Sequence, residues 1–333
     1  MPPPAPPPSL SREVLRIGSA LMLSAGELWG RWLDIGVRHG RAAAGLPPEA
    51  ATAAGRPTPV AAFRHVLEEL ALAPWLAWAR LGEELGRRPT PAPRVYTIAG
   101  RPLVLPARVQ DAAQGLALYA VPEPAANAIL AARGVPARAT GLGRGVAGLA
   151  LFGVRYRVSD LGTFEEMGAA LLVVPEGDPW ASGLYFLLHP VTGAFSCEAG
   201  NVVWGYPKTL EPIDSAWGPR HVTWRLRQGP AGPPLLAVTF PRGGAGASVA
   251  VPMPTYTLLD GTLHRTVFTR TGVGERIQVG GGEVALALGD PAACGSDPRW
   301  AVLRALGLGQ APPILHAWTE HLSGEFGPPV PVG

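Results

Sequence analysis

One lysine stands out among the residues of this chain that could do chemistry. Lys208 is the only lysine among 28 basic residues, and it lies near Val203, Trp204, Tyr206 and Leu210 in the segment GNVVWGYPKTLEPI. An amine held among apolar side chains is partly desolvated, which favours its neutral form. A neutral amine can form a Schiff base with a carbonyl substrate, whereas arginine stays charged in proteins and cannot. Composition alone is equally compatible with a single surface lysine that has no chemical role, so the neighbouring sequence has to decide between the two interpretations.

Two other motifs could suggest chemistry but lack the context it needs. Residues 143–148, GRGVAG, fit the pattern GxGxxG, yet a dinucleotide-binding turn needs a strand before it and a helix after it. Arginines and Pro136 precede this segment, and a strand-like apolar run follows it. His316 and His321 flank Glu320 in HAWTEH, which is one residue too long for an inverted zincin motif. We expect these histidines on the polar side of a terminal helix, and we predict neither a metal site nor a bound cofactor.

Composition narrows the class of protein. The chain has 333 residues, 47% of them hydrophobic, which suffices to bury a core and argues against disorder throughout. A net charge of +3, without a basic run, does not indicate a nucleic-acid partner. Two cysteines, Cys197 and Cys294, indicate neither a disulfide framework nor a metal site, so we expect a cytoplasmic protein. The apolar stretch from Ile17 to Gly26 is about half a membrane span, and a membrane location is not expected.

The chain divides into three parts by sequence texture. Residues 1–10 are a Pro-rich tail, and residues 11–90 carry apolar positions at helical spacing, interrupted by a Gly/Pro-rich loop, which predicts a helical hairpin. From residue 91 to 333, short apolar runs are separated by turn signals about every 8–12 residues, which is typical of a mostly antiparallel β domain. A closing helix is expected at Pro298–Leu306.

Paired tryptophans mark the predicted hairpin. Trp29 with Trp32, and Trp75 with Trp78, are each three residues apart and so share a helix face. Such pairs pack inward, against a partner subunit or on another protein. A membrane surface is the alternative, but the glutamates of the second segment count against it.

The segment around Lys208 resembles the acetoacetate decarboxylases. Gly200 and the run Tyr206-Pro207-Lys208 match the family's Gly and aromatic-Pro-Lys positions, whose lysine forms the Schiff base. Upstream, SDLGTFEEMG at 159–168 is similar to a family segment that places Glu166 on an active-site glutamate. The run GAALLVVPEGDPWASGLYFLLHP resembles the strand pair that leads to the lysine, and ALYAVPEP and the C-terminal tail are also similar. The resemblance covers roughly residues 91–330.

The resemblance implies a fold and a set of roles. It implies an α+β domain in which antiparallel sheets form a cone or barrel around a small apolar pocket, assembled into homo-oligomers. Lys208 would form the Schiff base, and Glu166 would move protons or orient the substrate. Arg101 lies about where the family keeps a carboxylate-binding arginine. Tyr206 and Trp204 would contribute to substrate binding.

Several departures from the family pattern leave the reaction open. The family's second lysine is Thr209 here, its Arg and Glu after the glycine are Asn201 and Val202, and Leu151 replaces an acidic residue. The first hypothesis is decarboxylation of a small β-keto acid through Lys208. The second is a Schiff-base aldolase or dehydratase that acts on a pyruvate-like keto acid. The third is a non-catalytic binding or scaffold protein that acts through its helical extension.

The predicted hairpin generates a test of its own. Its apolar stripes need a partner surface, because amphipathic helices gain most of their stability from packing. We predict that deleting residues 1–90 leaves a folded β domain but changes its oligomeric state or its binding to a partner. Light scattering and pull-down experiments on full-length and truncated protein measure both. Equal oligomer states with no lost partner, or a truncated chain that fails to fold, would contradict the prediction.

Overall fold

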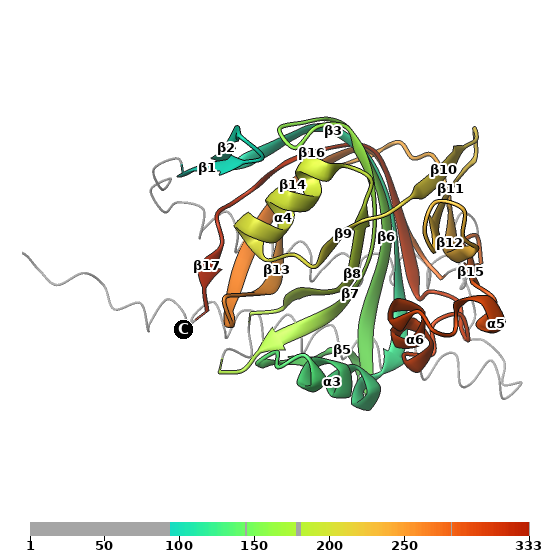
Figure 1. Ribbon diagram of the computed structural model, residues 1–333. Helices are drawn as coiled ribbons and strands as arrows, with labels where there is room; N and C mark the ends of the chain where they lie inside the picture. Colours follow the sequence, from blue (N-terminus) through green and yellow to red (C-terminus); the bar gives the residue numbers. More distant parts are fainter. Residues whose placement is uncertain (1–93, 144, 178–180, 281, 333) are drawn as a thin grey trace, which may run out of the picture. The chain divides into compact units, whose positions relative to one another are not determined.

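The computed structural model describes residues 94–143, 145–177, 181–280 and 282–332. The tail predicted at 1–10 and the helical hairpin predicted at 11–90, with its tryptophan pairs, lie outside these residues. The described part is mostly β-sheet with a few helices, as the sequence predicts (Figure 1). None of its helices is long and apolar enough to cross a bilayer.

Seven strands close into a barrel in the described part of the chain. Their order around the barrel is β7, β6, β3, β16, β14, β13 and β8, and β8 pairs again with β7. Six of these pairings are antiparallel, whereas β8 and β13 pair in parallel. A ring with an odd number of strands cannot alternate in direction throughout, so one parallel pair is required for closure. The bounds of these strands are β3 (Ala107–Pro122), β6 (Val146–Ser159), β7 (Phe164–Pro175), β8 (Gly183–Val191), β13 (Gly246–Leu259), β14 (Thr262–Val279) and β16 (Leu315–Phe326).

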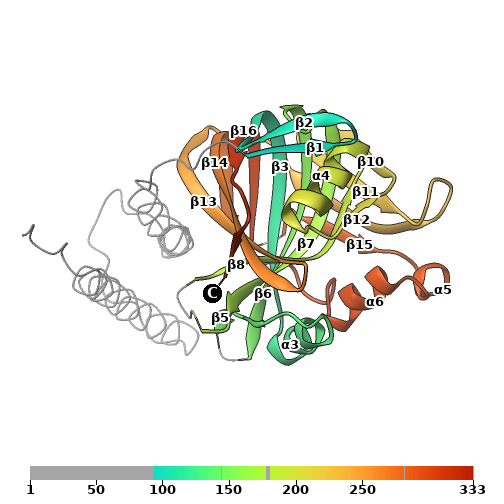
Figure 2. The same ribbon diagram turned by 60° about the vertical axis from the view of Figure 1, so that its left-hand side comes forward.

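Short strands extend or flank the barrel. β9 (Lys208–Leu210) pairs in parallel with β8, and β1 (Arg94–Ile98) pairs with β2 (Arg101–Leu105) as a separate hairpin. A second sheet has the order β10, β11, β12, β15 and lies beside the barrel in both ribbon views (Figures 1 and 2). The remaining short strands and the second sheet have these bounds: β4 (Ala137–Ala139), β5 (Gly141–Gly143), β17 (Val330–Pro331), β10 (Ile213–Trp217), β11 (His221–Arg227), β12 (Pro234–Pro241) and β15 (Ala285–Leu288).

Alternation of side chains along the strands creates two hydrophobic clusters. Successive side chains of a strand point to opposite faces, so each barrel strand contributes to both clusters. On β6, Phe152 and Val154 belong to the inner cluster, whereas Leu149 and Leu151 belong to the outer one. The outer cluster also contains side chains of the second sheet, such as Trp224. The barrel wall is therefore buried on both faces at this side.

Glycines let the second sheet approach the barrel closely. A Cβ atom at Gly153 would lie 2.5 Å from the indole ring of Trp224, and one at Gly115 would lie 2.4 Å from the ring of Phe240. Real Cβ atoms do not approach a ring carbon so closely, and both rings are fully buried. These two strand glycines therefore provide the space in which the two sheets pack.

Four helices are present among the described residues: α3 (Glu123–Ala132), α4 (Ala194–Trp204), α5 (Pro291–Cys294) and α6 (Pro298–Ala305). α6 confirms the helix expected at Pro298–Leu306, and the Asp297 side chain caps it by accepting a bond from Arg299 N. α4 was not predicted. It ends at Gly205, whose φ of 68° is the left-handed conformation that glycine adopts at helix C-termini.

The expectation of a terminal helix around HAWTEH is wrong. His316 and His321 both lie on β16, which pairs with β3 on one side and β14 on the other. Buried His316 and Trp318 are two residues apart, which is the period of a strand. Pairing on both edges of this segment outweighs its local helical character.

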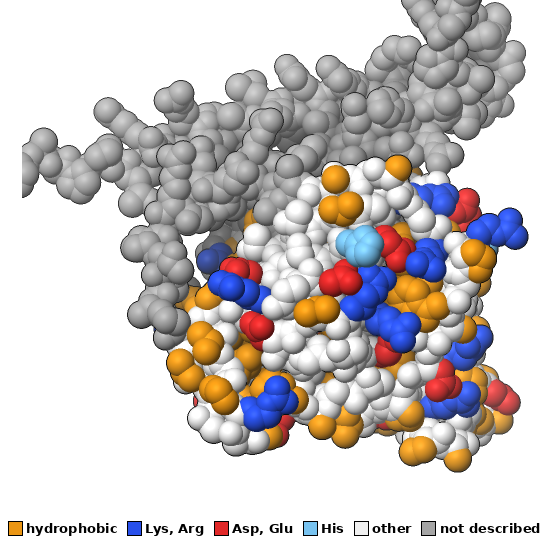
Figure 3. Space-filling view, turned by 90° about the horizontal axis from the view of Figure 1, so that it is seen from above, with side chains coloured by type: hydrophobic (Ala, Val, Ile, Leu, Met, Phe, Trp, Pro, Cys, Tyr) orange, Lys and Arg blue, Asp and Glu red, His pale blue; other side chains and the backbone are white. Residues whose placement is uncertain are grey.

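Acidic and basic side chains are interspersed on the molecular surface. Arg157 pairs with both Asp111 and Glu320, and Arg242 also pairs with Glu320. On the face shown in Figure 3, positive and negative side chains gather together without a patch of one sign. This mixture agrees with the small net charge of the sequence.

The packing at Gly153 predicts a stability effect. We expect Gly153→Ala to lower the free energy of unfolding by about 1–3 kcal/mol, because overpacking forces buried neighbours such as Trp224 to move. The matched control is Gly282→Ala, where no atom lies within 4 Å of a new Cβ. Urea unfolding measures both variants. Equal destabilisation of the two would contradict the packing argument.

Candidate active site

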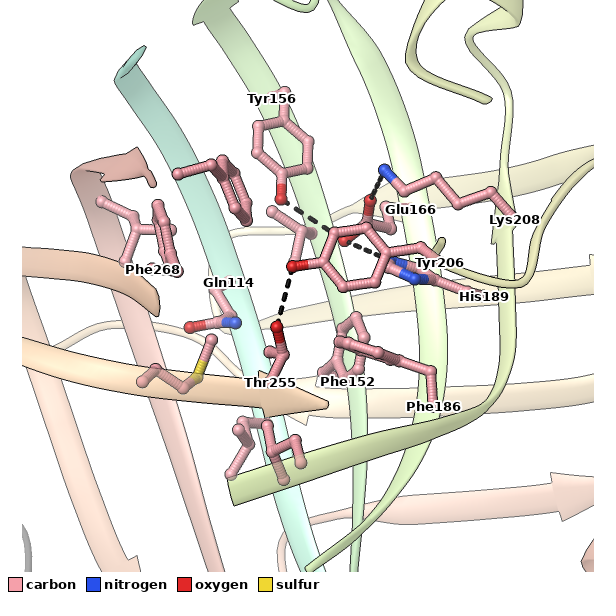
Figure 4. Close-up of a pocket in the computed structure, with 16 residues that line it drawn as sticks. Gln114, Phe152, Tyr156, Glu166, Phe186, His189, Tyr206, Lys208, Thr255 and Phe268 are labelled. Atoms are coloured by element: carbon pink, nitrogen blue, oxygen red, sulfur yellow. Dashed lines mark hydrogen bonds and ion pairs between the residues drawn. The ribbon is translucent and has the colours of Figure 1, made fainter. Parts of the chain in front are cut away.

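A small cavity lies inside the barrel, and all seven barrel strands contribute side chains to it (Figure 4). Its volume is about 40 Å³. One water centre needs roughly 10–15 Å³, so the cavity holds on the order of three waters. Its walls are mainly apolar, with a few polar groups. The lining residues are Gln114, Leu116, Phe152, Val154, Tyr156, Glu166, Leu184, Phe186, His189, Tyr206, Lys208, Met253, Thr255, Phe268, Leu322 and Phe326.

The backbone of Lys208 is fixed by α4. The side chain of Asn201 accepts a hydrogen bond from Lys208 N at 2.9 Å and donates one to Lys208 O at 3.1 Å. This pairing imitates a strand neighbour at the start of β9. On the other side, β9 pairs in parallel with β8, which sets Lys208 opposite His189. Asn201, which departs from the family pattern, therefore positions the lysine.

The side chain of Lys208 is buried, with 8% of the residue exposed. Its Nζ donates to Glu166 Oε2 at 2.9 Å and to Ser196 Oγ at 3.0 Å. The ring of Phe164 lies 5.4 Å from Nζ. Lys208 and Glu166 therefore form a buried ion pair. The sequence-based expectation that desolvation is the main influence on its charge did not include this ion pair.

Glu166 is the centre of the polar contacts. Besides Lys208, its carboxylate accepts a hydrogen bond from the Tyr156 hydroxyl at 3.3 Å, and His189 Nε2 lies 3.1 Å from its Oε1. Burial by itself raises the pKa of Glu166, but the charge of Lys208 and the contacts with His189 outweigh burial and lower this pKa to about 2. Glu166 is therefore ionised in the resting site.

His189 is held rigidly next to this carboxylate. Its ring stacks on Phe186, with centroids 4.3 Å apart, and forms T-shaped contacts with Phe152 and Tyr206. Burial lowers the pKa of His189 below its usual value, although Glu166 opposes this shift. The imidazole is therefore neutral near pH 7. Neither ring nitrogen makes a hydrogen bond of good geometry among the described residues, and Nε2 faces the charged Glu166 Oε1 at 3.1 Å.

The structure brings together some of the residues predicted from sequence. Lys208, Glu166 and Tyr206 all line the cavity, and the Tyr206 hydroxyl bonds Thr255 Oγ1 at 2.8 Å. Trp204 stands behind Tyr206, with ring centroids 6.1 Å apart, and its Nε1 donates to Gly327 O. Trp204 is not a lining residue.

Arg101 is not brought to the cavity. It is exposed on β2, and its guanidinium lies 4.2 Å from the ring centroid of Phe195. Leu151 faces the outer hydrophobic cluster, so the cavity does not meet this position either. No arginine is among the described residues that line the cavity.

Sequence reasoning missed His189, Ser196 and Tyr156. These residues lie on β8, α4 and β6, and only the strand register and the α4 crossover bring them to Glu166 and Lys208. The one local signal is the His-Pro pair at the end of the apolar run before α4. A histidine within a fully buried strand is noteworthy, because histidine is fully buried less often than the apolar residues around it.

Known structures provide the comparison. An acetoacetate decarboxylase from Legionella pneumophila superposes with a TM-score of 0.50 at 15% identity, covering 74% of this chain and 94% of that one. The chain has the acetoacetate decarboxylase fold. An acetoacetate decarboxylase-like enzyme from Sphingomonas wittichii gives 0.47 at 15% identity, covering 74% and 98%. The enduracididine biosynthesis enzyme MppR, complexed with pyruvate, gives 0.43 at 15% identity, covering 69% and 92%. The first of these matches carries the fold assignment.

Sequence comparison adds no family assignment. No protein-family model matches the chain, and no curated protein matches it by sequence. The structural match confirms the resemblance noted in the sequence as a likeness of fold.

The contact between α4 and Lys208 generates a prediction. A Cβ atom at Gly200 would lie 2.5 Å from Lys208 Cδ and 2.9 Å from its Cε, so Gly200→Ala displaces the amine. We expect the rate of adduct formation at Lys208 to fall about 10- to 100-fold, because small misplacements of a reacting group are costly. Reductive trapping followed by intact mass measures this rate. Val202→Ala, at an exposed position of the same helix, is the matched control. Equal rates in the two variants would refute the positioning role of Gly200.

Proposed function

We propose that this protein forms a Schiff base between Lys208 and a small β-keto acid and decarboxylates it. The observation that carries the proposal is the buried amine of Lys208 at the cavity wall, 2.9 Å from a carboxylate that can take its proton. The acetoacetate decarboxylase fold of the chain supports it. The proposal assigns no step to Arg101, which does not line the cavity. Tyr206 forms part of the cavity wall.

Formation of the Schiff base begins from the ion pair. Lys208 passes a proton to Glu166, and its nitrogen lone pair attacks the ketone carbon to form a C–N bond. Glu166 then returns the proton to the departing oxygen, so two protons of the ammonium group leave in water and one remains on the iminium nitrogen. Because the lysine is positively charged before and after, the site conserves its charge in this step.

Loss of carbon dioxide follows from the electron demand of the iminium group. The bond between the carboxylate carbon and its neighbour breaks, and its electron pair moves toward the iminium nitrogen to give an enamine. A negative and a positive charge disappear together in this step. Apolar walls favour it, because separated charges are poorly stabilised in a low-dielectric cavity. Protonation of the enamine and hydrolysis release the ketone and restore Lys208.

The chain offers an unusually direct test, because Lys208 is its only lysine. With acetoacetate and borohydride, intact mass should show one adduct, at Lys208. With acetoacetate alone, the protein should release carbon dioxide. We expect Lys208→Arg, which keeps the charge but cannot form an imine, to lose both the adduct and decarboxylation above background. Arg220→Lys in the Lys208→Arg background restores an amine at an exposed position, and it should not restore activity.

Each other outcome has a defined meaning. Decarboxylation by Lys208→Arg at the wild-type rate would overturn the mechanism. An adduct with pyruvate but no carbon dioxide from acetoacetate would favour the aldolase or dehydratase hypothesis. The absence of any adduct in the wild type would favour a protein that binds but does not catalyse.

A further inference from the structure

The proposed decarboxylation consumes one proton for each carboxylate that is lost. The substrate anion and one proton become a neutral ketone and carbon dioxide, and the new proton must end on the carbon that carried the carboxylate. A site that performs this reaction therefore needs a group that takes up a proton in each cycle and delivers it near Lys208.

Most polar groups of the cavity are poorly suited to this role. Glu166 is ionised in the resting site, and Lys208 is engaged in the Schiff base. Burial, together with the nearby Glu166 carboxylate, raises the pKa of the Tyr156 and Tyr206 hydroxyls well above their usual value, so neither hydroxyl is an effective acid. Of the described residues that line the cavity, His189 is the remaining side chain that can both accept and donate a proton.

The geometry connects His189 with the reacting atoms through Glu166. His189 Nε2 lies 3.1 Å from Glu166 Oε1, and Glu166 Oε2 lies 2.9 Å from Lys208 Nζ (Figure 4). The carbon to be protonated is two bonds from that nitrogen in the enamine. The carboxylate therefore lies between the imidazole and the place where the proton is needed.

The charge of the cavity favours proton uptake when an anion enters. Lys208 and Glu166 cancel each other, so a substrate carboxylate leaves the buried site with an excess negative charge. The groups that face His189 are Glu166, Lys208, Tyr206 and the rings of Phe186 and Phe152. Burial among these rings and the charge of Lys208 oppose a charge on the imidazole, and Glu166 favours it, so the negative charge that the substrate adds shifts this balance toward proton uptake. Nδ1 has no hydrogen-bond partner among the described residues and can accept the added proton.

We propose that His189 takes up one proton when the anionic substrate binds and delivers it, through Glu166, to the carbon that loses carbon dioxide. This inference rests on the proposed function. The Nε2–H bond breaks as an O–H bond forms on Glu166. That bond breaks in turn as the enamine π electrons form the new C–H bond, and the nitrogen becomes an iminium again. His189 is then neutral, ready to take up the next proton from solvent with the next substrate.

Two substrates of similar size separate this role from imine formation. Acetoacetate is an anion, whereas acetylacetone is a neutral β-diketone that forms a conjugated, ultraviolet-absorbing adduct with an amine. In the wild type, the ratio of kcat/KM for acetoacetate to the adduct-forming rate constant for acetylacetone should fall about tenfold for each pH unit above neutrality, because one proton accompanies the anion. The ratio removes any pH dependence that the two imine-forming steps share.

In His189→Gln, this pH dependence should disappear, and kcat with acetoacetate should fall about 100-fold or more. The rate of adduct formation with acetylacetone should change little. The matched control is His221→Gln, at an exposed position of β11, which should behave as the wild type. A His189→Gln variant with the wild-type pH slope and kcat would overturn the inference.

A second variant guards against a purely structural effect. His189→Ala leaves space for a small base, so added imidazole should restore decarboxylation in a concentration-dependent and pH-dependent manner. Failure of imidazole to raise the rate of a folded His189→Ala variant that still forms the acetylacetone adduct would count against proton delivery.

If the wild type forms no adduct at Lys208, the proposed function fails and this inference with it. If it forms the adduct and releases carbon dioxide while the histidine variants match it, this inference alone fails.

Discussion

The ion pair between Lys208 and Glu166 is the interaction on which the interior of the barrel depends. A single buried charge costs several kcal/mol, and a buried pair is tolerated only when its remaining hydrogen-bonding positions are also satisfied. Ser196, Tyr156 and His189 supply these contacts from three different elements. The barrel can therefore hold a polar centre among apolar walls, and the same arrangement keeps a proton donor and a proton acceptor in contact.

The crossover from β8 through α4 to β9 delivers the lysine to this centre. Because β8 and β9 are parallel, the chain has to return along the barrel between them, and α4 makes this connection. Gly205 ends the helix in a left-handed conformation, and Asn201 then fixes the backbone of Lys208. The site thus stands on a rigid unit, which is what a precisely placed nucleophile requires.

The sequence predicts one half of the site better than the other. Lys208 and Glu166 could be found because each lies in a recognisable local segment, and the β-rich character followed from short apolar runs. His189 and Ser196 could not, because their roles depend on which strands become neighbours. Arg101 was expected to bind the substrate carboxylate only because it lies about where the family keeps such an arginine. The structure leaves it exposed on β2, and it does not line the cavity. The segment 316–321 was expected in a terminal helix, yet it lies on β16, with which two neighbouring strands pair.

The departures from the family pattern have a different meaning once the strand faces are known. Thr209 follows Lys208 on β9 and is exposed, since successive residues of a strand point to opposite faces. Leu151 likewise faces the outer cluster, one residue before the cavity-lining Phe152. Neither substitution removes a charge from the lining of this cavity. The charge around the amine is instead set inside the barrel, where one oxygen of Glu166 contacts Lys208 and the other contacts His189.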